Sequence, residues 1–455
     1  MNFGNGRIRP SGGIMVCGFC LVGAVLLGLS LAMDRMSQLR FTWAKHVVFA
    51  FTWTGLWTLW QQFSPIGDFG SYVNILSEQS WKLTFSMHTL LSAKYHPAAS
   101  YSQFNQPELL QFASIAGLGG IDFILSWGGA IGAYILYTFI DYQRRNSFLS
   151  RIYSPVVVYL VVLSLIYTYG SIRLAVAETP FYQRSMRTYI PKSLTRVGCV
   201  LGKVFNGTTD ETNAYLVDET RKLAESGSQI VIWSEGAAAV FNEEEKHALF
   251  NAVRDLSVTY NTYIAFSYID HAEQYNKVTL VSSEGEVVID YIKAHPVIGV
   301  EKVRAGPDEL KTVDTKFGVV GVAVCFDYNF PRLIRQASKK KVDLMLQPSS
   351  TWVSPVGPVH AHMNSIRAIE NGFISFRCSS DGVSGVWSSY GQIIHAVPTS
   401  FTPAVMFDIP LRKRVMTVYG EIGETWGYLC VLITIMLLAC LIATEYGSQK
   451  MKYWG

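Results

Sequence analysis

Long stretches without charged side chains limit this chain more than any other feature of its sequence. A helix needs about 20 residues to cross the roughly 30 Å of hydrocarbon in a bilayer. Five uncharged or nearly uncharged stretches approach or exceed this length, at residues 11–33, 46–63, 109–140, 152–171 and 425–444, with Asp122 in the third. Only 16% of the residues are charged, against about 25% in ordinary soluble proteins. We therefore predict a membrane helical bundle, with about four transmembrane helices over residues 1–180 and a C-terminal transmembrane helix over 425–444.

The basic residues of the short loops predict the orientation of this bundle. Lys and Arg concentrate in cytoplasmic loops, and the loops at 34–45 and 141–151 each carry three of them. Both loops are therefore expected inside, and the region after residue 171 on the outer (periplasmic, extracellular or lumenal) side of a multi-pass integral membrane protein. The start of the chain then also lies outside, which conflicts with the charges of Arg7 and Arg9.

Between residues 190 and 420 the pattern changes to short apolar runs separated by polar helices and turns, as in a soluble α/β or α+β domain. Asn242 followed by three glutamates predicts a helix start, because the Asn side chain caps backbone N–H groups and acidic residues favour the first turn. Pro331 predicts a helix that extends to Lys341. The remaining expected elements are strands at 229–233, 262–268, 317–324, 342–346 and 373–377, a helix that ends over 366–372, and hairpins at 278–291 and 386–394.

Three strand ends, or the loops behind them, present polar residues that suit one kind of chemistry. Glu235 follows the run QIVIWS, Lys293 follows VVIDYI, and Cys325 follows FGVVGVAV. A thiol becomes a useful nucleophile when a base takes its proton and a nearby cation stabilises the negative charge. Taken singly, the glutamate also suits a cap, the lysine a solvated surface, and the cysteine a small buried hydrophobe. Their combination predicts a base, a cation and a nucleophile.

Four motifs in a fixed order carry a resemblance to a known family. They are VIWSEG at 231–236, YIKAHPVIGVE at 291–301, GVAVCFDYNFP at 321–331 and RAIENG at 367–372. With them the chain resembles the nitrilase, or carbon-nitrogen hydrolase, superfamily, whose members carry a Glu-Lys-Cys triad on an αββα sandwich. The resemblance implies an α/β nitrilase-like αββα sandwich domain over residues 190–420, with Glu235, Lys293 and Cys325 as its catalytic residues.

The membrane stretches around this domain make the chain similar to one branch, the apolipoprotein N-acyltransferases, because most members of the superfamily are soluble. Glu301 stands eight residues after Lys293, where this branch has an additional active-site glutamate. Trp352, with the Gly-Pro pair that follows it, resembles the tryptophan-bearing loop of the branch. Residues 101–123 also resemble a segment that leads into one of its later membrane helices.

The chain departs from this branch in three places. Asp327, two residues after the cysteine, stands where the bacterial enzymes have glutamate, so we expect shorter local hydrogen bonding. Ser349 and Ser350 stand where the tryptophan loop usually begins Asn-Asp. The branch also has more spans before the catalytic domain than the four expected here, and the similarity at 101–123 implies that its first three are absent. Loss of an odd number would explain the predicted side of the N-terminus.

The resemblance also implies a reaction. Cys325 would attack an ester of a membrane phospholipid to form a thioester, and the acyl chain would pass to an amine, such as the N-terminal cysteine of an apolipoprotein. Glu235 would move the protons, and Lys293 would stabilise the oxyanion. Glu301 would orient Lys293 or Glu235, and Trp352 would gate the acyl chain or the acceptor.

No cofactor or metal is expected at this site. His295, His360 and His362 lack the spacing of zinc ligands. The seven cysteines have no regular spacing, which excludes a disulfide framework, and we expect Cys378 to be a core residue of a strand. The formal net charge of +4 forms no basic stripe, so nucleic-acid binding has no electrostatic footprint. The expected partners are a phospholipid acyl donor, a lipoprotein or other amine acceptor, and the membrane.

Two other functions remain open at this point. The first is a membrane-anchored amidase or nitrilase-type hydrolase, in which water instead of an amine resolves the acyl-enzyme. Because both reactions use the same three residues, the sequence separates them poorly. The second is a scaffold that has kept the fold without activity. The presence of Glu235, Lys293 and Cys325 together speaks against a scaffold, since only chemistry requires all three.

Overall fold

The computed structural model describes residues 10–40, 46–63, 106–145, 148–178, 194–202, 208–297, 300–351, 356–399 and 403–454. Among these residues, those from 175 to 421 form one compact unit, and those before 175 and after 421 form a second. Each unit has hydrophobic clusters of its own.

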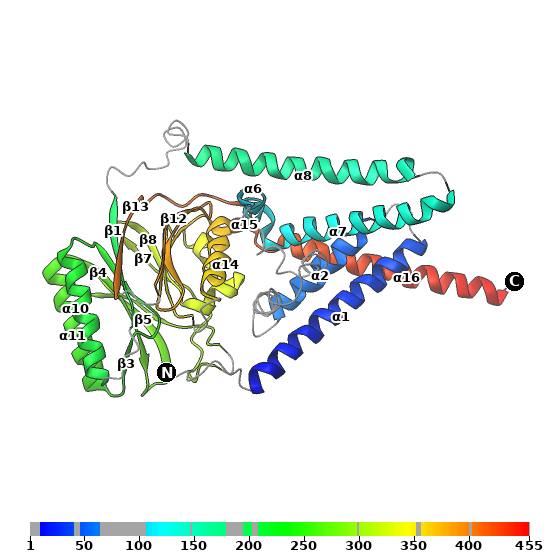
Figure 1. Ribbon diagram of the computed structural model, residues 1–455. Coiled ribbons are helices and arrows are strands. Elements are labelled where there is room, and N and C mark those ends of the chain that lie inside the picture. The colour runs from blue at the N-terminus through cyan, green and yellow to red at the C-terminus, as the bar shows by residue number, and fades with distance from the viewer. Residues whose placement is uncertain are drawn as a thin grey trace. The chain divides into compact units, whose positions relative to one another are not determined.

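Helices build the second unit (Figure 1). They are α1 (Pro10–Arg40), α2 (Val48–Phe63), α6 (Pro107–Leu110), α7 (Ala113–Arg145), α8 (Phe148–Glu178) and α16 (Thr425–Trp454). Small residues let α2 and α16 approach closely. A Cβ at Gly55 would lie 3.0 Å from the backbone nitrogen of Val431, and one at Gly427 would clash with Thr58 Oγ1. Close contacts at small residues are typical of helices that pack inside a membrane.

Three helices among the described residues are long and apolar enough to cross a membrane, namely Ala113–Ile140, Tyr153–Ala177 and Thr425–Thr444. They agree with the predicted stretches at 109–140, 152–171 and 425–444, which supports a membrane protein. The predicted spans at 11–33 and 46–63 coincide with α1 and α2, which are not among these three. The number of spans therefore stays a prediction. α7 also contains a break at Gly117, whose φ of 63° is not helical.

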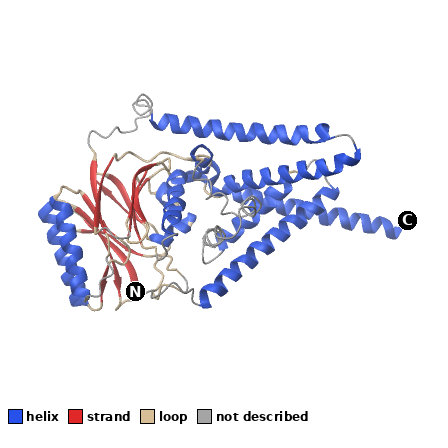
Figure 2. Cartoon of the chain, in the orientation of Figure 1, coloured by secondary structure: helices blue, strands red, loops and turns tan. Residues whose placement is uncertain are grey.

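Two mixed β-sheets form the centre of the other unit (Figure 2). The first sheet has the strand order β13-β1-β2-β4-β5-β6, with β3 beside β4, and the second has the order β12-β11-β10-β9-β8-β7. The strands of the first are β1 (Thr195–Val200), β2 (Ile230–Trp233), β3 (Ala238–Val240), β4 (Tyr263–Asp270), β5 (Tyr275–Val281), β6 (Val287–Ile292) and β13 (Ala404–Ile409). Those of the second are β7 (Lys311–Thr315), β8 (Gly318–Val322), β9 (Leu344–Ser349), β10 (Ile374–Ser379), β11 (Val383–Trp387) and β12 (Ile393–Pro398).

Helices cover the outer face of each sheet and complete the predicted αββα sandwich (Figure 1). The first sheet carries α10 (Thr209–Glu225) and α11 (Glu243–Tyr260), and the second carries α12 (Pro331–Ile334), α13 (Gln336–Lys339) and α14 (Val356–Asn371). Side chains such as Ile232 and Val322 fill the layer between the sheets, and Leu249 and Leu333 belong to the layers under the helices. Burial of these apolar side chains supplies the main driving force for folding.

Most of the predicted elements of this unit are present. Asn242 caps α11 by accepting the Glu245 N–H at 2.9 Å, and the two predicted hairpins are the pairs β5–β6 and β11–β12. The helix over 366–372 is the end of the longer α14. The prediction of one helix from Pro331 to Lys341 is wrong, because α12 and α13 are separated at Arg335, whose guanidinium donates to the Glu421 carbonyl at 2.6 Å.

A disulfide between Cys199 on β1 and Cys378 on β10 joins the two sheets, and the sequence did not predict it. Both residues are fully buried, so Cys378 is the core residue that we expected, but it carries a covalent bond. The two cysteines are 179 positions apart. A bond that closes so long a loop restricts the unfolded chain and thereby stabilises the sandwich.

Candidate functional site

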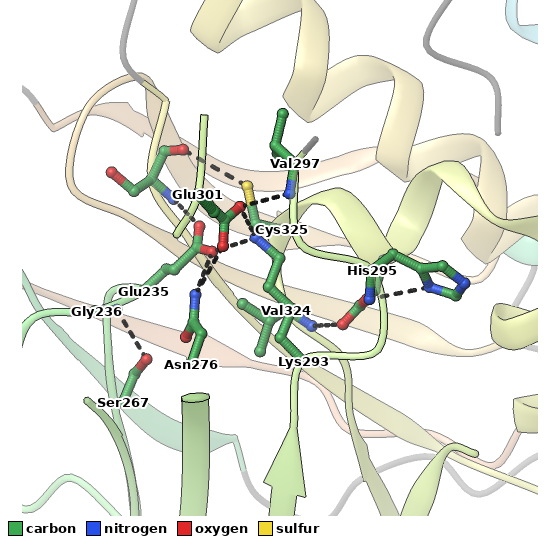
Figure 3. A network of polar contacts seen from close by, with 12 residues as sticks. Glu235, Gly236, Ser267, Asn276, Lys293, His295, Val297, Glu301, Val324 and Cys325 are labelled. Atoms are coloured by element: carbon green, nitrogen blue, oxygen red, sulfur yellow. Dashed lines mark hydrogen bonds and ion pairs between the residues drawn. The ribbon is translucent and has the colours of Figure 1, made fainter. Parts of the chain in front are cut away.

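The predicted site residues meet at one edge of the sandwich, where strands of both sheets end (Figure 3). Glu235 follows β2, Lys293 follows β6 and Cys325 follows β8. β2 and β4 are parallel, and β4 and β6 both pair with β5 in antiparallel fashion, so β2, β4 and β6 end at the same edge. In sheets with parallel strands, sites form at the carboxyl ends of the strands. The structure therefore brings residues from three distant segments together.

Glu235 forms hydrogen bonds with the end of β9 through both its main chain and its side chain. Its carboxylate Oε2 accepts the Ser350 N–H at 3.0 Å, and its own N–H donates to the Ser349 carbonyl at 3.3 Å. The next residue, Gly236, has a φ of 56°, a conformation that glycine adopts readily. The Gly236 N–H donates to the Ser267 hydroxyl at 2.9 Å, which fixes the turn that presents the glutamate.

Lys293 is fully buried between two carboxylates. Its Nζ donates to Glu235 Oε1 at 2.6 Å and also to Glu301 Oε1. Asn276 on β5 donates its side-chain amide to the same two acids, at 3.0 Å to Glu235 Oε1 and at 3.4 Å to Glu301 Oε2. The Val297 N–H adds a bond of 3.1 Å to Glu301 Oε1. Because a buried charge needs partners of opposite sign, the lysine and the two acids act as one bonded unit.

Cys325 begins the short 3₁₀ helix η2 (Cys325–Asn329) in a strained backbone conformation. Its φ is 44°, in the left-handed region that residues with a side chain rarely adopt. Strain of this kind costs free energy and concentrates at functional sites. The thiol donates to the Ser350 carbonyl at 3.5 Å. Ser350 therefore binds Glu235 through its N–H and Cys325 through its carbonyl.

Asp327 connects the turn at the cysteine with the segment around the lysine. Its Oδ2 accepts the Val324 N–H at 2.9 Å and the Tyr291 hydroxyl at 2.7 Å, and its Oδ1 accepts the His295 N–H at 2.8 Å. The predicted strand at 317–324 is correspondingly too long, since β8 ends at Val322 and the Val324 N–H binds Asp327 instead of a neighbouring strand. The shorter acid at this position thus satisfies three donors from both sides of the site.

Burial and charge together determine the protonation of the three side chains. Burial raises the pKa of Glu235 above its ordinary value, although Lys293 opposes this effect. Burial by itself lowers the pKa of Lys293, but the charges of Glu235 and Glu301 raise it well above its usual range, so the ammonium stays protonated. Burial and the charge of Glu235 raise the pKa of Cys325 to about 12. The resting cysteine is therefore a neutral thiol that needs a base to react.

The supporting residues fall into two groups. Glu301 and Asp327 lie in the hydrogen-bonded cluster around the site, whereas Trp352 lies outside the described residues. Sequence reasoning missed Asn276, although an asparagine inside a strand is a signal, because asparagine is depleted in strands. It also missed the contacts of Ser350 with the base and the thiol. These contacts are made by the Ser350 backbone, so no pattern of side chains in the sequence could predict them.

In the part of the chain that the structure describes, no group of three or more His, Cys, Asp or Glu side chains is arranged to hold a metal ion. Two of the histidines considered from sequence have other contacts. The His295 ring stacks on Phe330 with ring centroids 3.5 Å apart. His360 Nδ1 lies 3.2 Å from a guanidinium nitrogen of Arg377.

Known proteins resemble this chain over its αββα unit, and several apolipoprotein N-acyltransferases resemble it over most of its length. Residues 205–411 match the family described as carbon-nitrogen hydrolase. An apolipoprotein N-acyltransferase of Geobacter metallireducens is 26% identical over 367 residues, covering 73% of this chain and 67% of that protein. A deaminated glutathione amidase of Dictyostelium discoideum is 28% identical over 158 residues, covering 30% of this chain and 54% of that protein. Among solved structures, an amidase of the nitrilase superfamily from Nesterenkonia AN1 has a TM-score of 0.44 and 18% identity, covering 49% of this chain and 93% of that one.

Proposed function

Because this chain is an apolipoprotein N-acyltransferase-like member of the nitrilase superfamily, we propose that it moves an acyl chain from a phospholipid to an amine through a thioester on Cys325. The acceptor class is a lipoprotein amine, such as that of an N-terminal cysteine. The unit at 175–421 is the catalytic domain, and the helices before and after it anchor it at the bilayer that supplies the donor. The observation that carries the proposal is the cluster of Glu235, Lys293 and Cys325, in which Ser350 links the thiol to the glutamate, in a chain with candidate membrane spans.

In the first half-reaction, Cys325 Sγ attacks the carbonyl carbon of the phospholipid ester while Glu235 takes the thiol proton. Lys293, whose Nζ contacts Glu235, stabilises the oxyanion of the tetrahedral intermediate. The intermediate collapses by breaking the bond between the acyl carbon and the glycerol oxygen. Glu235 returns its proton to this oxygen, and a lysophospholipid leaves. The acyl group remains on sulfur.

In the second half-reaction, the amine nitrogen of the acceptor attacks the thioester carbonyl. Glu235 takes a proton from the nitrogen as the new carbon–nitrogen bond forms. The carbon–sulfur bond then breaks, and Glu235 gives the proton to the sulfur, which restores the thiol. Glu301 accepts from the Lys293 ammonium, and Asn276 donates to both Glu235 and Glu301. These contacts keep the carboxylate and the ammonium in place during both halves.

The catalytic domain is proposed to lie on the outer side of the membrane. The basic loops at 34–45 and 141–151 support this orientation. The disulfide between Cys199 and Cys378 supports it independently, because disulfides persist in oxidising compartments and are rare in the cytosol. Protease treatment of sealed vesicles that expose the outer face of the membrane tests the orientation. Digestion of the αββα unit only after the vesicles are opened, so that the protease reaches the cytoplasmic face, would contradict it.

Intact-protein mass spectrometry tests the reaction. We would incubate the detergent-purified chain with a defined phosphatidylethanolamine and measure its mass before and after hydroxylamine. We expect an acyl mass that hydroxylamine removes in the wild type and in Cys440→Ala, but not in Cys325→Ala. Cys440 is the matched control, because it is exposed on α16. No acyl mass on the wild type, with Cys325 still reactive, would exclude a lipid-derived thioester.

The alternative is a membrane-anchored amidase, in which water resolves the acyl-enzyme. The similarity to an amidase over part of the catalytic unit favours this alternative. Both functions use Cys325 as the nucleophile, so they are distinguished by the acyl donor, which is a phospholipid in one case and an amide in the other. Acylation of Cys325 by a small amide, but not by a phospholipid, would establish the amidase.

A further inference from the structure

Three residues at the end of β9, here called the 349–351 segment, contact both the proposed base and the proposed nucleophile. The Ser350 N–H donates to Glu235 Oε2 at 3.0 Å, and the Ser350 carbonyl accepts the Cys325 thiol at 3.5 Å. The Ser349 carbonyl accepts the Glu235 N–H at 3.3 Å. A shift of this segment would therefore move the base and the thiol relative to each other.

The last residues of the neighbouring strand β10 hold the 349–351 segment in place. β9 and β10 are parallel, with Ser379 opposite Ser349. One residue later, the Ser380 N–H donates to the Ser349 carbonyl at 3.2 Å, and its hydroxyl donates to Ser350 Oγ at 3.0 Å. Thr351 Oγ1 lies 3.3 Å from Ser379 Oγ. The segment thus depends on β10 for its position.

Arg377 is the charged residue at the centre of these contacts, and it is fully buried. Its Nη2 lies 3.4 Å from Thr351 Oγ1, 3.5 Å from Ser379 Oγ and 3.2 Å from His360 Nδ1. Its Nε donates to the Val383 carbonyl at 3.1 Å. The planar guanidinium therefore binds groups on or beside β9, β10, β11 and α14 at once. A lysine cannot reproduce this fork of donors.

The same cation also lies within the electrostatic range of the thiol. The charges of Glu235, Lys293 and Arg377 act on the Cys325 thiol. Burial and Glu235 raise the pKa of Cys325, whereas Lys293 and Arg377 lower it. Loss of Arg377 would therefore both loosen the 349–351 segment and make the thiolate harder to form.

We propose that Arg377 is a positioning residue for acyl transfer, which holds the 349–351 segment where Ser350 binds Glu235 and Cys325 together. The proposal rests on the proposed function for the roles of the base and the nucleophile. Arg377 acts through the segment and does not contact the lipid. Its loss should lower the rate of the chemical steps and leave the affinity for the donor unchanged.

The experiment compares Arg377→Met and Arg377→Lys in the full chain in detergent. We expect kcat to fall about 10²-fold in Arg377→Met, because a small misplacement of reacting groups has effects of this size. We expect Arg377→Lys to recover part of the loss, because it restores the charge but not the fork of donors. KM for the phospholipid should stay within about twofold of the wild-type value in both variants.

Alkylation of Cys325 by iodoacetamide, measured against pH without lipid, separates this proposal from the proposed function. We expect the alkylation profile of Arg377→Met to move to higher pH, and that of Arg377→Lys to remain near the wild type. If the chain does not acylate at all, this measurement still tests whether Arg377 acts on the thiol. An unchanged profile in Arg377→Met would overturn the proposal.

Thr351→Val tests whether Arg377 acts through the segment, because it removes the hydroxyl that Nη2 reaches and keeps the shape of the side chain. The two substitutions should not be additive, so that Thr351→Val lowers kcat in the wild type and has little further effect in Arg377→Met. Additive losses would contradict the proposed route. If Arg377→Met does not fold, an unchanged kcat in both Thr351→Val and Arg377→Lys would likewise overturn it.

The matched control is Arg367→Lys, which replaces another buried arginine that pairs with Glu370 within α14. This change tests whether loss of a buried guanidinium alone accounts for the results. We expect a lower midpoint of thermal unfolding with an unchanged alkylation profile. An alkylation shift equal to that of Arg377→Met would mean that general loosening, not the 349–351 segment, explains the effect.

Discussion

Replacing Glu235 by glutamine tests the proposed base most directly, because the change removes the charge and preserves the shape. The carboxylate accepts three hydrogen bonds, from Ser350 N–H, Lys293 Nζ and Asn276 Nδ2. An amide has one oxygen, so one or more of these donors would face an NH₂ group and lose its acceptor. An unsatisfied buried donor lowers the free energy of unfolding by about 1–3 kcal/mol. This is less than the total free energy of unfolding of most folded domains. We therefore expect Glu235→Gln to be folded and less stable than the wild type.

The effect on the rate follows from the pKa of the thiol. With the pKa of Cys325 raised to about 12, only about 3 in 10⁵ molecules carry a thiolate at pH 7.5. Without a base, the reaction depends on this small fraction, although loss of the Glu235 charge lowers the thiol pKa somewhat. General base catalysis contributes about 10²–10⁴-fold. We expect acylation of Cys325 to slow by this factor.

The assay is single-turnover acylation with phosphatidylethanolamine, quenched and measured as hydroxylamine-labile mass between pH 6 and 9. The residual rate in Glu235→Gln should rise about tenfold for each pH unit, because the thiolate fraction rises tenfold per unit below the pKa. In the wild type, the rate should instead fall as the pH drops and the buried carboxylate, whose pKa is raised, takes up a proton.

Glu301→Gln is the matched control for this prediction. It makes the same chemical change on the other side of Lys293, in an acid that contacts the lysine and Asn276. We expect a smaller loss of rate and no tenfold rise per pH unit. A rate in Glu235→Gln within threefold of the wild type, or one that is flat with pH, would refute Glu235 as the base.

The remaining predictions concern the nucleophile, the cation and the disulfide. Cys325→Ala should abolish turnover and leave the thermal unfolding midpoint close to the wild-type value, whereas Cys440→Ala should leave turnover unchanged; turnover by Cys325→Ala would remove it as the nucleophile. Lys293→Met should slow acylation by about 10²-fold or more and destabilise the fold by about 3–5 kcal/mol, because it leaves buried acids without their cation; a stable variant with full acylation rate would contradict both roles. Cys199→Ala with Cys378→Ala should lower the free energy of unfolding by about 2–5 kcal/mol, and peptide mapping without reductant should find the two cysteines linked in the wild type; two free thiols would contradict the disulfide and weaken the proposed outer location.

Local patterns in the sequence predicted much of the fold and the residues of the proposed site. The cap at Asn242, the hairpins and the apolar strands depend on neighbouring residues. The cap and the hairpins formed where they were predicted, and the strands formed with different ends. Glu235, Lys293 and Cys325 were found because each follows an apolar strand and belongs to a motif. The charge distribution and the apolar stretches likewise indicated the membrane helices, since bilayer thickness sets their length.

Tertiary structure alone decided which groups support that centre, because their contacts join segments far apart in sequence. Asn276 bridges two acids, Ser350 bonds through its backbone, and neither role leaves a side-chain pattern nearby. The Cys199–Cys378 bond joins residues 179 positions apart, which the spacing of seven cysteines does not reveal. The ends of elements were also decided in three dimensions, since Asp327 takes the Val324 N–H and shortens β8. Sequence patterns report the local preference of the chain, whereas packing selects among the partners that distant segments bring to each polar group.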